Sequence, residues 1–245
     1  MPRQSAIRGA PPIWTQQVAP RRPRALGTDE IVAAATALAD EGGPDAITMK
    51  AVAARLGPYT PMALYRYVHS KEGLIDLMLD AAIATVDVPE RPGSDWRADL
   101  ASTATATRQM IKAHPWYAAL VHTRPPAGPH TMRRTEFMLE VLVGRGASLE
   151  DAMTYAALID RHVFGSGLQE AEEARFFARE GVDSGEKLVA AIRSLHDLAV
   201  ANGRVPLLAN WLAHPSAGSV DEQFELGLGF LLDGIAGRLP RRRSR

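Results

Sequence analysis

Side chains suited to binding nucleic acid are concentrated around the segment ARLGPYTPMALYRYV, residues 54–68. Tyr65, Arg66 and Tyr67 follow one another there, just after a turn that contains two prolines. An arginine can donate two hydrogen bonds to one guanine, and hydroxyl groups reach phosphates or base edges. Thr48 and Lys71 flank the segment, where backbone phosphates would pass. These residue types favour nucleic-acid recognition over catalysis.

Two short helices joined by a turn must position these groups. The apolar spacing predicts a helix that starts at Thr48 and is stopped by Gly57. A second helix is predicted over 61–68, because proline is tolerated in the first turn of a helix. A longer helix, with Thr28 as its N-cap, would precede them, and Ser70 would cap a fourth. Two short helices around a tight glycine turn form a helix-turn-helix, whose second helix enters a major groove.

The second helix would carry most of the DNA contacts. Its expected contact residues, with two at its start, are Tyr59, Thr60, Met62, Ala63, Arg66 and Tyr67. Arg66 is expected to bind phosphate or to make mixed contacts, since at least half of protein–DNA hydrogen bonds go to the backbone. Tyr67 either contacts DNA or packs at the domain junction. Arg22 and Arg24 either enter the minor groove or belong to a solvated tail.

The composition narrows the class of protein. The 245 residues include 28 basic and 28 acidic residues and no cysteine, which excludes disulfides and thiolate zinc sites. A net charge of zero argues against a general nucleic-acid binder, but no acid precedes Asp29, whereas several arginines do. No apolar run reaches the ~18 residues of a membrane span, and the N-terminus does not resemble a signal peptide. We therefore expect a cytoplasmic protein without a membrane partner.

The predicted fold class is all-α. Residues 1–27 are expected to be a basic, mostly disordered arm, and residues 239–245 a basic tail. A helix-turn-helix bundle would occupy 28–88, and a larger helical bundle 94–238, with the linker VPERPGS between them. In the larger bundle, a long helix is predicted from Ser148 toward Glu173. A last helix would be opened by the capping box of Ser219 and Glu222.

The stretch GGPDAITMKAVAARLGPYTPMALYRYVHSKEGLIDLML resembles the N-terminal domain of the tetracycline-repressor (TetR) family of bacterial transcription regulators. The matching positions are Gly43, Ile47, Thr48, Val52, Ala53, Gly57, Leu64, Tyr65, Val68, Lys71 and Leu74. The resemblance implies that Thr48, Tyr65 and Lys71 contact phosphates. One departure is the turn, where six residues instead of five separate Gly57 from the Leu-Tyr pair. One added residue rotates a helix face by about 100°, so base contacts do not transfer directly.

Past the linker, the stretches HPWYAALVHTRPPAGPH and FELGLGFLLDGI resemble the C-terminal domain of the tetracycline repressor and its relatives. This resemblance implies a small-molecule effector and a homodimer held by a four-helix bundle. Tetracycline-binding members hold magnesium through a histidine at the position of Leu120, and through a glutamate that aligns with Gln169. We therefore expect no binding of magnesium–tetracycline, and no cofactor or metal.

Eight residues are candidates for an apolar effector pocket: Trp116, Leu120, Arg124, Phe137, Met138, His162, Phe164 and Gln169. For each apolar residue taken alone, core packing is the simpler explanation, and only the group as a whole favours a pocket. Glycines at 165, 167, 227, 229, 234 and 237 favour close approach of the last helices, because an interior glycine costs ~1 kcal/mol.

The sequence as a whole predicts a non-enzymatic, ligand-responsive regulator, a repressor that binds a palindromic double-stranded DNA operator and is released by a small apolar effector. Three alternatives remain open at this stage. The first is an activator or dual regulator of the same fold, and the second is an all-α enzyme or ligand-binding protein with a relic DNA head. The third is a sensor that acts through a protein partner.

Overall fold

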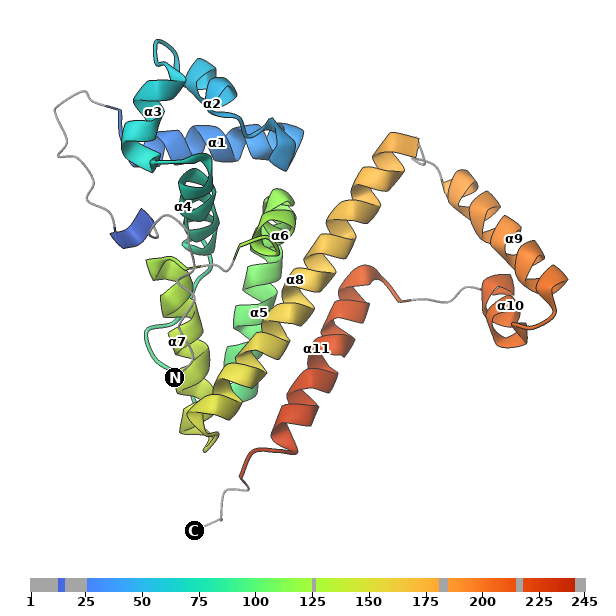
Figure 1. Ribbon diagram of the computed structural model, residues 1–245. Coiled ribbons are helices and arrows are strands. Elements are labelled where there is room, and N and C mark those ends of the chain that lie inside the picture. The colour runs from blue at the N-terminus through green and yellow to red at the C-terminus, as the bar shows by residue number, and fades with distance from the viewer. Residues whose placement is uncertain (1–12, 16–25, 125–126, 181–184, 215–217, 241–245) are drawn as a thin grey trace, which may run out of the picture.

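The computed structural model describes residues 13–15, 26–124, 127–180, 185–214 and 218–240 (Figure 1). Within these ranges every regular element is a helix, which confirms the all-α prediction. Arg22 and Arg24 lie outside the described residues, as does the tail from residue 241 onward. No helix of the described ranges is long and apolar enough to cross a membrane.

Three helices form the head of the molecule: α1 (Thr28–Gly42), α2 (Met49–Leu56) and α3 (Pro61–Val68). The short 3-10 turn η2 (Pro44–Ala46) joins α1 to α2. The prediction of Thr28 as N-cap is wrong, because Thr28 is already helical and Gly27 occupies the cap position. Glu30 accepts a hydrogen bond of 2.7 Å from the Gly27 N–H, so the glutamate satisfies this end of the helix.

The helix α4 (Lys71–Ile83) leads from the head into the rest of the molecule, and the Ser70 hydroxyl caps it by accepting from the Gly73 N–H. It packs against α5 (Trp96–Ala113), α6 (Trp116–Val121) and α7 (Pro129–Gly144). The chain between α4 and α5 contains the predicted linker. Because α4 touches both parts, it is the element best placed to connect them.

The long helix α8 (Leu149–Glu180) is the centre of the larger bundle, which we term the effector domain. It packs against α5, α6, α7 and α11 (Val220–Ala236), and it extends past the expected end at Glu173. The predicted capping box opens α11, where the Ser219 hydroxyl accepts from the Glu222 N–H and Glu222 accepts from the Ser219 N–H.

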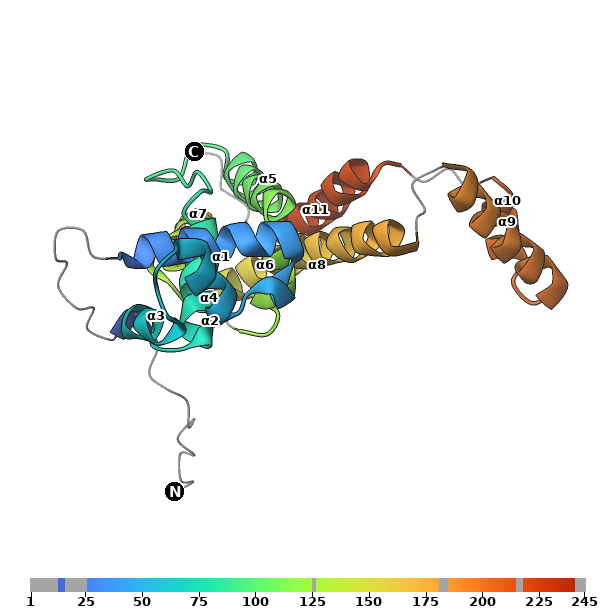
Figure 2. The same ribbon diagram turned by 90° about the horizontal axis from the view of Figure 1, so that it is seen from above.

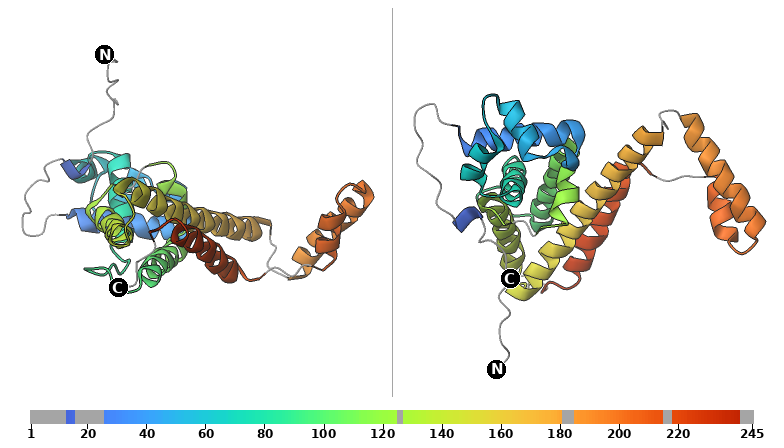
Figure 3. Two further views of the ribbon diagram at one scale, coloured as in Figure 1. Left: turned by 90° about the horizontal axis from the view of Figure 1, so that it is seen from below. Right: turned by 45° about the horizontal axis from the view of Figure 1, so that its top comes forward.

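Two helices stand apart from the body: α9 (Gly185–Asn202) and α10 (Pro206–Ala213). They pack against each other, and Figures 1, 2 and 3 all show them separated from the remaining helices. The sequence analysis did not predict α10. Its sequence, PLLANWLA, is short and begins with proline, so the pattern is equally compatible with a loop.

One short segment of the N-terminal arm is among the described residues. Residues Ile13–Thr15 form the 3-10 turn η1, which packs against α4. The Ile13 side chain is buried, and its Cδ1 lies 3.2 Å from where a Cβ on Gly73 would stand. An isoleucine and a tryptophan side by side give this segment enough apolar surface to dock.

Two of the six glycines predicted to allow close approach of helices do so within the chain. A Cβ on Gly167 would lie 2.6 Å from Ile111 Cγ2, and one on Gly227 would lie 2.6 Å from His162 Cε1. At Gly165, Gly229 and Gly234, no neighbouring atom lies within 4 Å of where a Cβ would stand, so no described part of this chain requires them to be small.

Candidate DNA-binding surface and effector domain

The turn between α2 and α3 is built by Gly57 and Thr60. Gly57 ends α2 with φ of 99°, a conformation that other residues rarely adopt. The Thr60 hydroxyl caps α3 by accepting from the Ala63 N–H at 3.3 Å, and Pro61 occupies the first helical position. Pro58, Tyr59 and Thr60 lie in the link, whereas the rest of the six-residue stretch belongs to α3.

The two faces of α3 differ sharply in exposure. Leu64 and Val68 are fully buried in the core of the head. The opposite face carries Met62, which is 75% exposed, Tyr65, which is 38% exposed, and Arg66. An exposed methionine beside an arginine and a tyrosine gives this face both apolar and hydrogen-bonding groups. This face is the one that a major groove would receive.

The charge of the head supports an anionic partner. Between residues 47 and 71 there are four basic residues and no acidic one. Arg55 is engaged by Glu41 of α1 at 2.7 Å, and its guanidinium holds the pKa of that carboxyl below its usual value. Arg66 has no such partner among the described residues, so its charge faces solvent.

Carboxylates on the head hold it to the effector domain at several points. The Asp40 carboxylate, near the end of α1, accepts from Trp116 Nε1 at 2.6 Å and contacts His114 Nδ1 at 2.8 Å. On α4, Asp76 receives two hydrogen bonds from the Arg124 guanidinium at 2.6 and 2.8 Å. This paired geometry raises the pKa of Arg124 further, so the arginine stays charged at every ordinary pH.

The third carboxylate, Asp80 of α4, caps a helix of the other domain. It accepts from the backbone N–H groups of His130 and Thr131, from the Thr131 hydroxyl and from His130 Nδ1. Gly128 precedes α7 at this point, and a Cβ there would collide with the carboxylate. A buried carboxylate at the start of α7 is favoured because the positive end of the helix faces it.

The interior of the effector domain contains a buried arginine. Arg134 of α7 donates to the Thr107 hydroxyl at 2.9 Å and to the Asp160 carboxylate at 2.8 Å. Beside it, the Tyr117 hydroxyl is buried with no hydrogen-bond partner in the described structure. Burial raises the pKa of Tyr117 well above its usual value, so the phenol is neutral.

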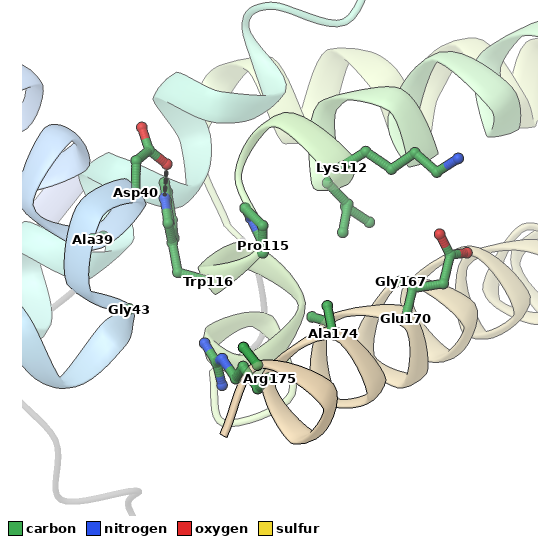
Figure 4. Close-up of a pocket in the computed structure, with 13 residues that line it drawn as sticks. Ala39, Asp40, Gly43, Lys112, Pro115, Trp116, Gly167, Glu170, Ala174 and Arg175 are labelled. Carbon is green, nitrogen blue, oxygen red and sulfur yellow. Dashed lines mark hydrogen bonds between the residues drawn. The ribbon is translucent and has the colours of Figure 1, made fainter. Parts of the chain in front are cut away.

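A cavity of about 450 Å³ lies where α8 leaves the body (Figure 4). The end of α1, the junction of α5 and α6, and the second half of α8 form its walls. Its lining residues are Ala39, Asp40, Gly43, Ile111, Lys112, Pro115, Trp116, Gly167, Glu170, Ala171, Ala174, Arg175 and Ala178. Both the head and the effector domain therefore contribute to it.

Two family models match the chain. The model for bacterial regulatory proteins of the tetR family covers residues 31–78, and the model for the tetracyclin repressor-like C-terminal domain covers residues 88–239. The chain belongs to the TetR family. It is a DNA-binding transcriptional regulator, and the head described above is the part that the first model matches.

Relatives in this TetR family include named repressors. The HTH-type transcriptional repressor DrrR1 of Streptomyces coeruleorubidus is 32% identical over 220 residues, which are 89% of this chain and 80% of that protein. The tetracycline repressor protein class A from transposon 1721 of Escherichia coli is 30% identical over 217 residues, 87% of this chain and 92% of that protein.

The crystal structure of the TetR family protein ActR of Streptomyces coelicolor in complex with (S)-DNPA has a similar fold. It superimposes with a TM-score of 0.72 at 26% identity and covers 88% of this chain and 100% of that one. The similarity therefore extends over both domains of this TetR-family chain.

The predicted DNA contacts of this TetR-family head lie on one side, with different degrees of exposure. Thr48 and Thr60 are exposed but use their hydroxyl oxygens to cap α2 and α3. Tyr59 and Tyr67 are half-buried and pack against buried residues of the core. The remaining predicted contacts, Ala63 and Lys71, are also half-buried.

The eight predicted pocket residues are spread over several environments. Trp116 lines the cavity of Figure 4, while Phe137 and Met138 are fully buried. The His162 ring stacks on Phe224 at 4.8 Å between ring centroids, and its Nε2 lies 2.9 Å from the Phe224 carbonyl oxygen. Four other predicted residues are placed as follows: Leu120 half-buried, Arg124 paired with Asp76, Phe164 against the Tyr117 ring, and Gln169 exposed and bonded to Glu173.

Several residues of these sites were missed by sequence reasoning. Asp40 and Asp80 read as ordinary helix-surface acids, and Arg134, beside Arg133, reads as part of a charged face. Their partners lie 26 to 76 positions away in the chain, which no local pattern reveals. Among the described residues, no group of three or more histidine, aspartate or glutamate side chains is arranged to hold a metal ion.

Proposed function

We propose that the protein is a homodimeric repressor that binds a palindromic operator through two copies of α3 and leaves it when a small molecule binds. The observation that carries this proposal is the exposed face of α3, with Met62, Tyr65 and Arg66 on a head that has no acid between residues 47 and 71. Named repressors among its relatives at 30% identity or more support repression rather than activation.

The proposed residue roles follow exposure and chemistry. Thr48, Tyr65 and Lys71 would contact phosphates, and Arg66 would bind phosphate or a guanine edge. The remaining proposed contacts at or near bases are Tyr59, Thr60, Met62, Ala63 and Tyr67, and Arg22 and Arg24 would reach the minor groove. DNA as the target implies that the protein acts in the cytoplasm.

The proposed dimer would form through α8 and α11. On the outer side of α11, Leu226 is 58% exposed and Phe230 is 66% exposed. Gly229 and Gly234 lie on the same helix with open space beside them. Apolar side chains next to glycines fit the close approach of a second pair of helices, which would complete a four-helix bundle.

The proposed effector acts by preferring the arrangement of heads that does not fit the operator, since a ligand with equal affinity for both arrangements shifts nothing. The solved relative ActR was crystallised with a bound small molecule. The contacts of α4 with the effector domain, Asp76 with Arg124 and Asp80 with the start of α7, offer a route from such a ligand to the head.

A mobility-shift experiment tests the DNA-binding part of the proposal. The full chain should bind the DNA directly upstream of its own gene more tightly than an unrelated fragment of equal length, and its affinity should fall steeply with salt. The double variant Tyr65→Ala, Lys71→Ala should lose this binding while sedimenting as a dimer. Absence of any sequence preference at moderate salt would overturn the proposal.

A matched pair of arginine variants sharpens the assignment to α3. Arg66→Ala removes an exposed cation of α3, whereas Arg55→Ala removes a cation of the same head that Glu41 already engages. We expect Arg66→Ala to weaken operator binding by about 10-fold or more, in line with about 1–3 kcal/mol for a base contact. Equal losses for the two variants would show that α3 has no special role.

A further inference from the structure

The cavity between the head and α8 has the size of a small-molecule site. Its volume of about 450 Å³ lies within the roughly 300–1,000 Å³ that ligand pockets occupy. Figure 4 shows its walls coming from α1 on one side, from Pro115 and Trp116 on another, and from α8 below. A ligand in this space would touch both domains at once.

The apolar wall that is open to the cavity is formed by Pro115 and by the exposed alanines Ala174 and Ala178 of α8, whereas Ile111 and Trp116 border it as buried residues, 2% and 1% exposed. Small residues of α8 recur about once per turn on this side (Gly167, Ala171, Ala174 and Ala178), with the charged Glu170 and Arg175 among them. Gly167 lets α8 approach Ile111 closely, and the alanines beyond it leave room where the helix moves away from the body. A flat apolar molecule could lie against Pro115 and these alanines.

Two of the four charged side chains of the cavity, Asp40 and Lys112, already have partners and are therefore less available to bind a ligand. The Asp40 carboxylate oxygen that faces Trp116 also contacts His114. Lys112 Nζ lies 2.6 Å from an Asp221 oxygen. Figure 4 shows the Lys112 ammonium pointing toward the edge of the cavity instead of into it.

The other two charged side chains differ in their partners. Glu170 accepts a hydrogen bond of 2.9 Å from Nε of the buried Arg108 and is ion-paired with Nη2 of the same guanidinium at 2.8 Å. Arg175 is paired only with Glu172 among the described residues, three positions earlier on the same helix, and both side chains are exposed. Such a pair is weak because water competes for both partners. Arg175 is therefore the cation that is available to an incoming anion, and it stands beside Gly43 of the head.

We infer that this cavity is the effector site and that it takes a small carboxylic acid with a flat apolar body. The carboxylate would pair with Arg175, and the body would lie against Pro115 and the exposed alanines of α8. The inference rests on the proposed function, because it locates the effector of that regulator. Since Asp40 bonds Trp116 across the same cavity, a ligand there would press directly on the bond between head and effector domain.

The test measures binding of 2-naphthoate to the full-length protein by ligand-observed NMR, with uncharged 2-naphthamide as the matched compound. Arg175→Ala should weaken naphthoate binding by about 10-fold or more, as expected for a hydrogen bond to a charged group, and should leave naphthamide binding unchanged. Ala174→Phe fills the cavity and should abolish binding of both compounds. Ala201→Phe, an equal change on the exposed surface of α9, should abolish neither.

Three results would overturn the inference: no naphthoate binding to the unaltered protein, naphthoate binding that survives Ala174→Phe, or equal affinity for naphthoate in Arg175→Ala and the unaltered protein. Thermal unfolding shows whether Ala174→Phe is folded. If Ala174→Phe is unfolded, Arg175→Ala still tests the site independently. Operator binding is measured separately. Naphthoate binding without any operator binding would support the site and refute the repressor function. If another compound still releases Ala174→Phe from the operator, the repressor function is supported and the assignment of the effector to this cavity is refuted.

Discussion

Replacing Asp80 by alanine removes the acceptor that joins α4 to the first turn of α7. Asp80 is only 4% exposed, and it accepts from the His130 N–H at 3.3 Å, from the Thr131 N–H at 2.9 Å and from the Thr131 hydroxyl at 3.0 Å. His130 Nδ1 lies 2.8 Å from its second oxygen. The alanine variant would leave the two buried Thr131 donors without an acceptor.

The expected loss of stability can be built from these contacts. Loss of a helix cap costs about 1 kcal/mol. Each buried donor left without an acceptor adds about 1 kcal/mol or more, so the sum is about 3 kcal/mol. For a chain of this size, a loss of 1 kcal/mol lowers the unfolding temperature by roughly 2–4 °C. We therefore expect Asp80→Ala to lower that temperature by about 6–12 °C.

The assay is thermal unfolding followed by circular dichroism at one fixed protein concentration, because dimer formation makes the unfolding temperature depend on concentration. Asp80→Asn keeps one acceptor oxygen and should lose about half as much stability. Asp87→Ala, an exposed aspartate beyond the end of α4, should change the free energy of unfolding by less than about 0.5 kcal/mol. If Asp80→Ala unfolds at the same temperature as Asp87→Ala, the reasoning about the cap is refuted.

Other predictions concern separate parts of the molecule. Gly57→Ala should cost about 1–3 kcal/mol of stability in denaturant unfolding, because its φ of 99° suits only glycine. Lys71→Ala should reduce the slope of log affinity against log salt by about 1 per head in operator titrations, and an unchanged slope would exclude a phosphate contact. Gly227→Ala should cost about 1–3 kcal/mol in the same unfolding assay, since the new Cβ would meet the His162 ring at 2.6 Å. The pKa of Asp221 is lowered by hydrogen bonds from two cations of α5, so its stabilising effect is complete above about pH 5 and is lost as pH falls through its folded pKa. The gap in unfolding temperature between Asp221→Asn and the unaltered protein should therefore shrink as the pH is lowered below about 5.

Local chemistry made the head predictable. The bounds of α3 and the cap at Ser70 follow from residues within four positions of each helix start, as does the capping box of α11 outside the head. Propensity rules act over that range, and nothing distant overrides them here. The prediction of Thr28 as the cap was wrong because the helix begins one residue earlier than expected, where the Glu30 carboxylate accepts a hydrogen bond from the Gly27 N–H.

Long-range packing explains what the sequence did not reveal. Most of the residues predicted to line a pocket were apolar, and two of them, Phe137 and Met138, are buried in the core of the effector domain. The cavity instead arises where α8 separates from the body, next to alanines and to Asp40 of the head. A single sequence does not show whether an alanine lines a cavity, because that depends on how far away the facing helix lies.

The bonds between head and effector domain described above all run in one chemical direction. The acceptors Asp40, Asp76 and Asp80 belong to α1 and α4, and every donor to them belongs to the effector domain. A foreign head joined to this effector domain would need carboxylates at the positions of Asp40, Asp76 and Asp80, in addition to the packing of α4, to keep these hydrogen bonds. A chimera that carries all three carboxylates would keep the hydrogen bonds between the two domains. A chimera that lacks one of them would leave a tryptophan, a guanidinium or a helix end without its acceptor.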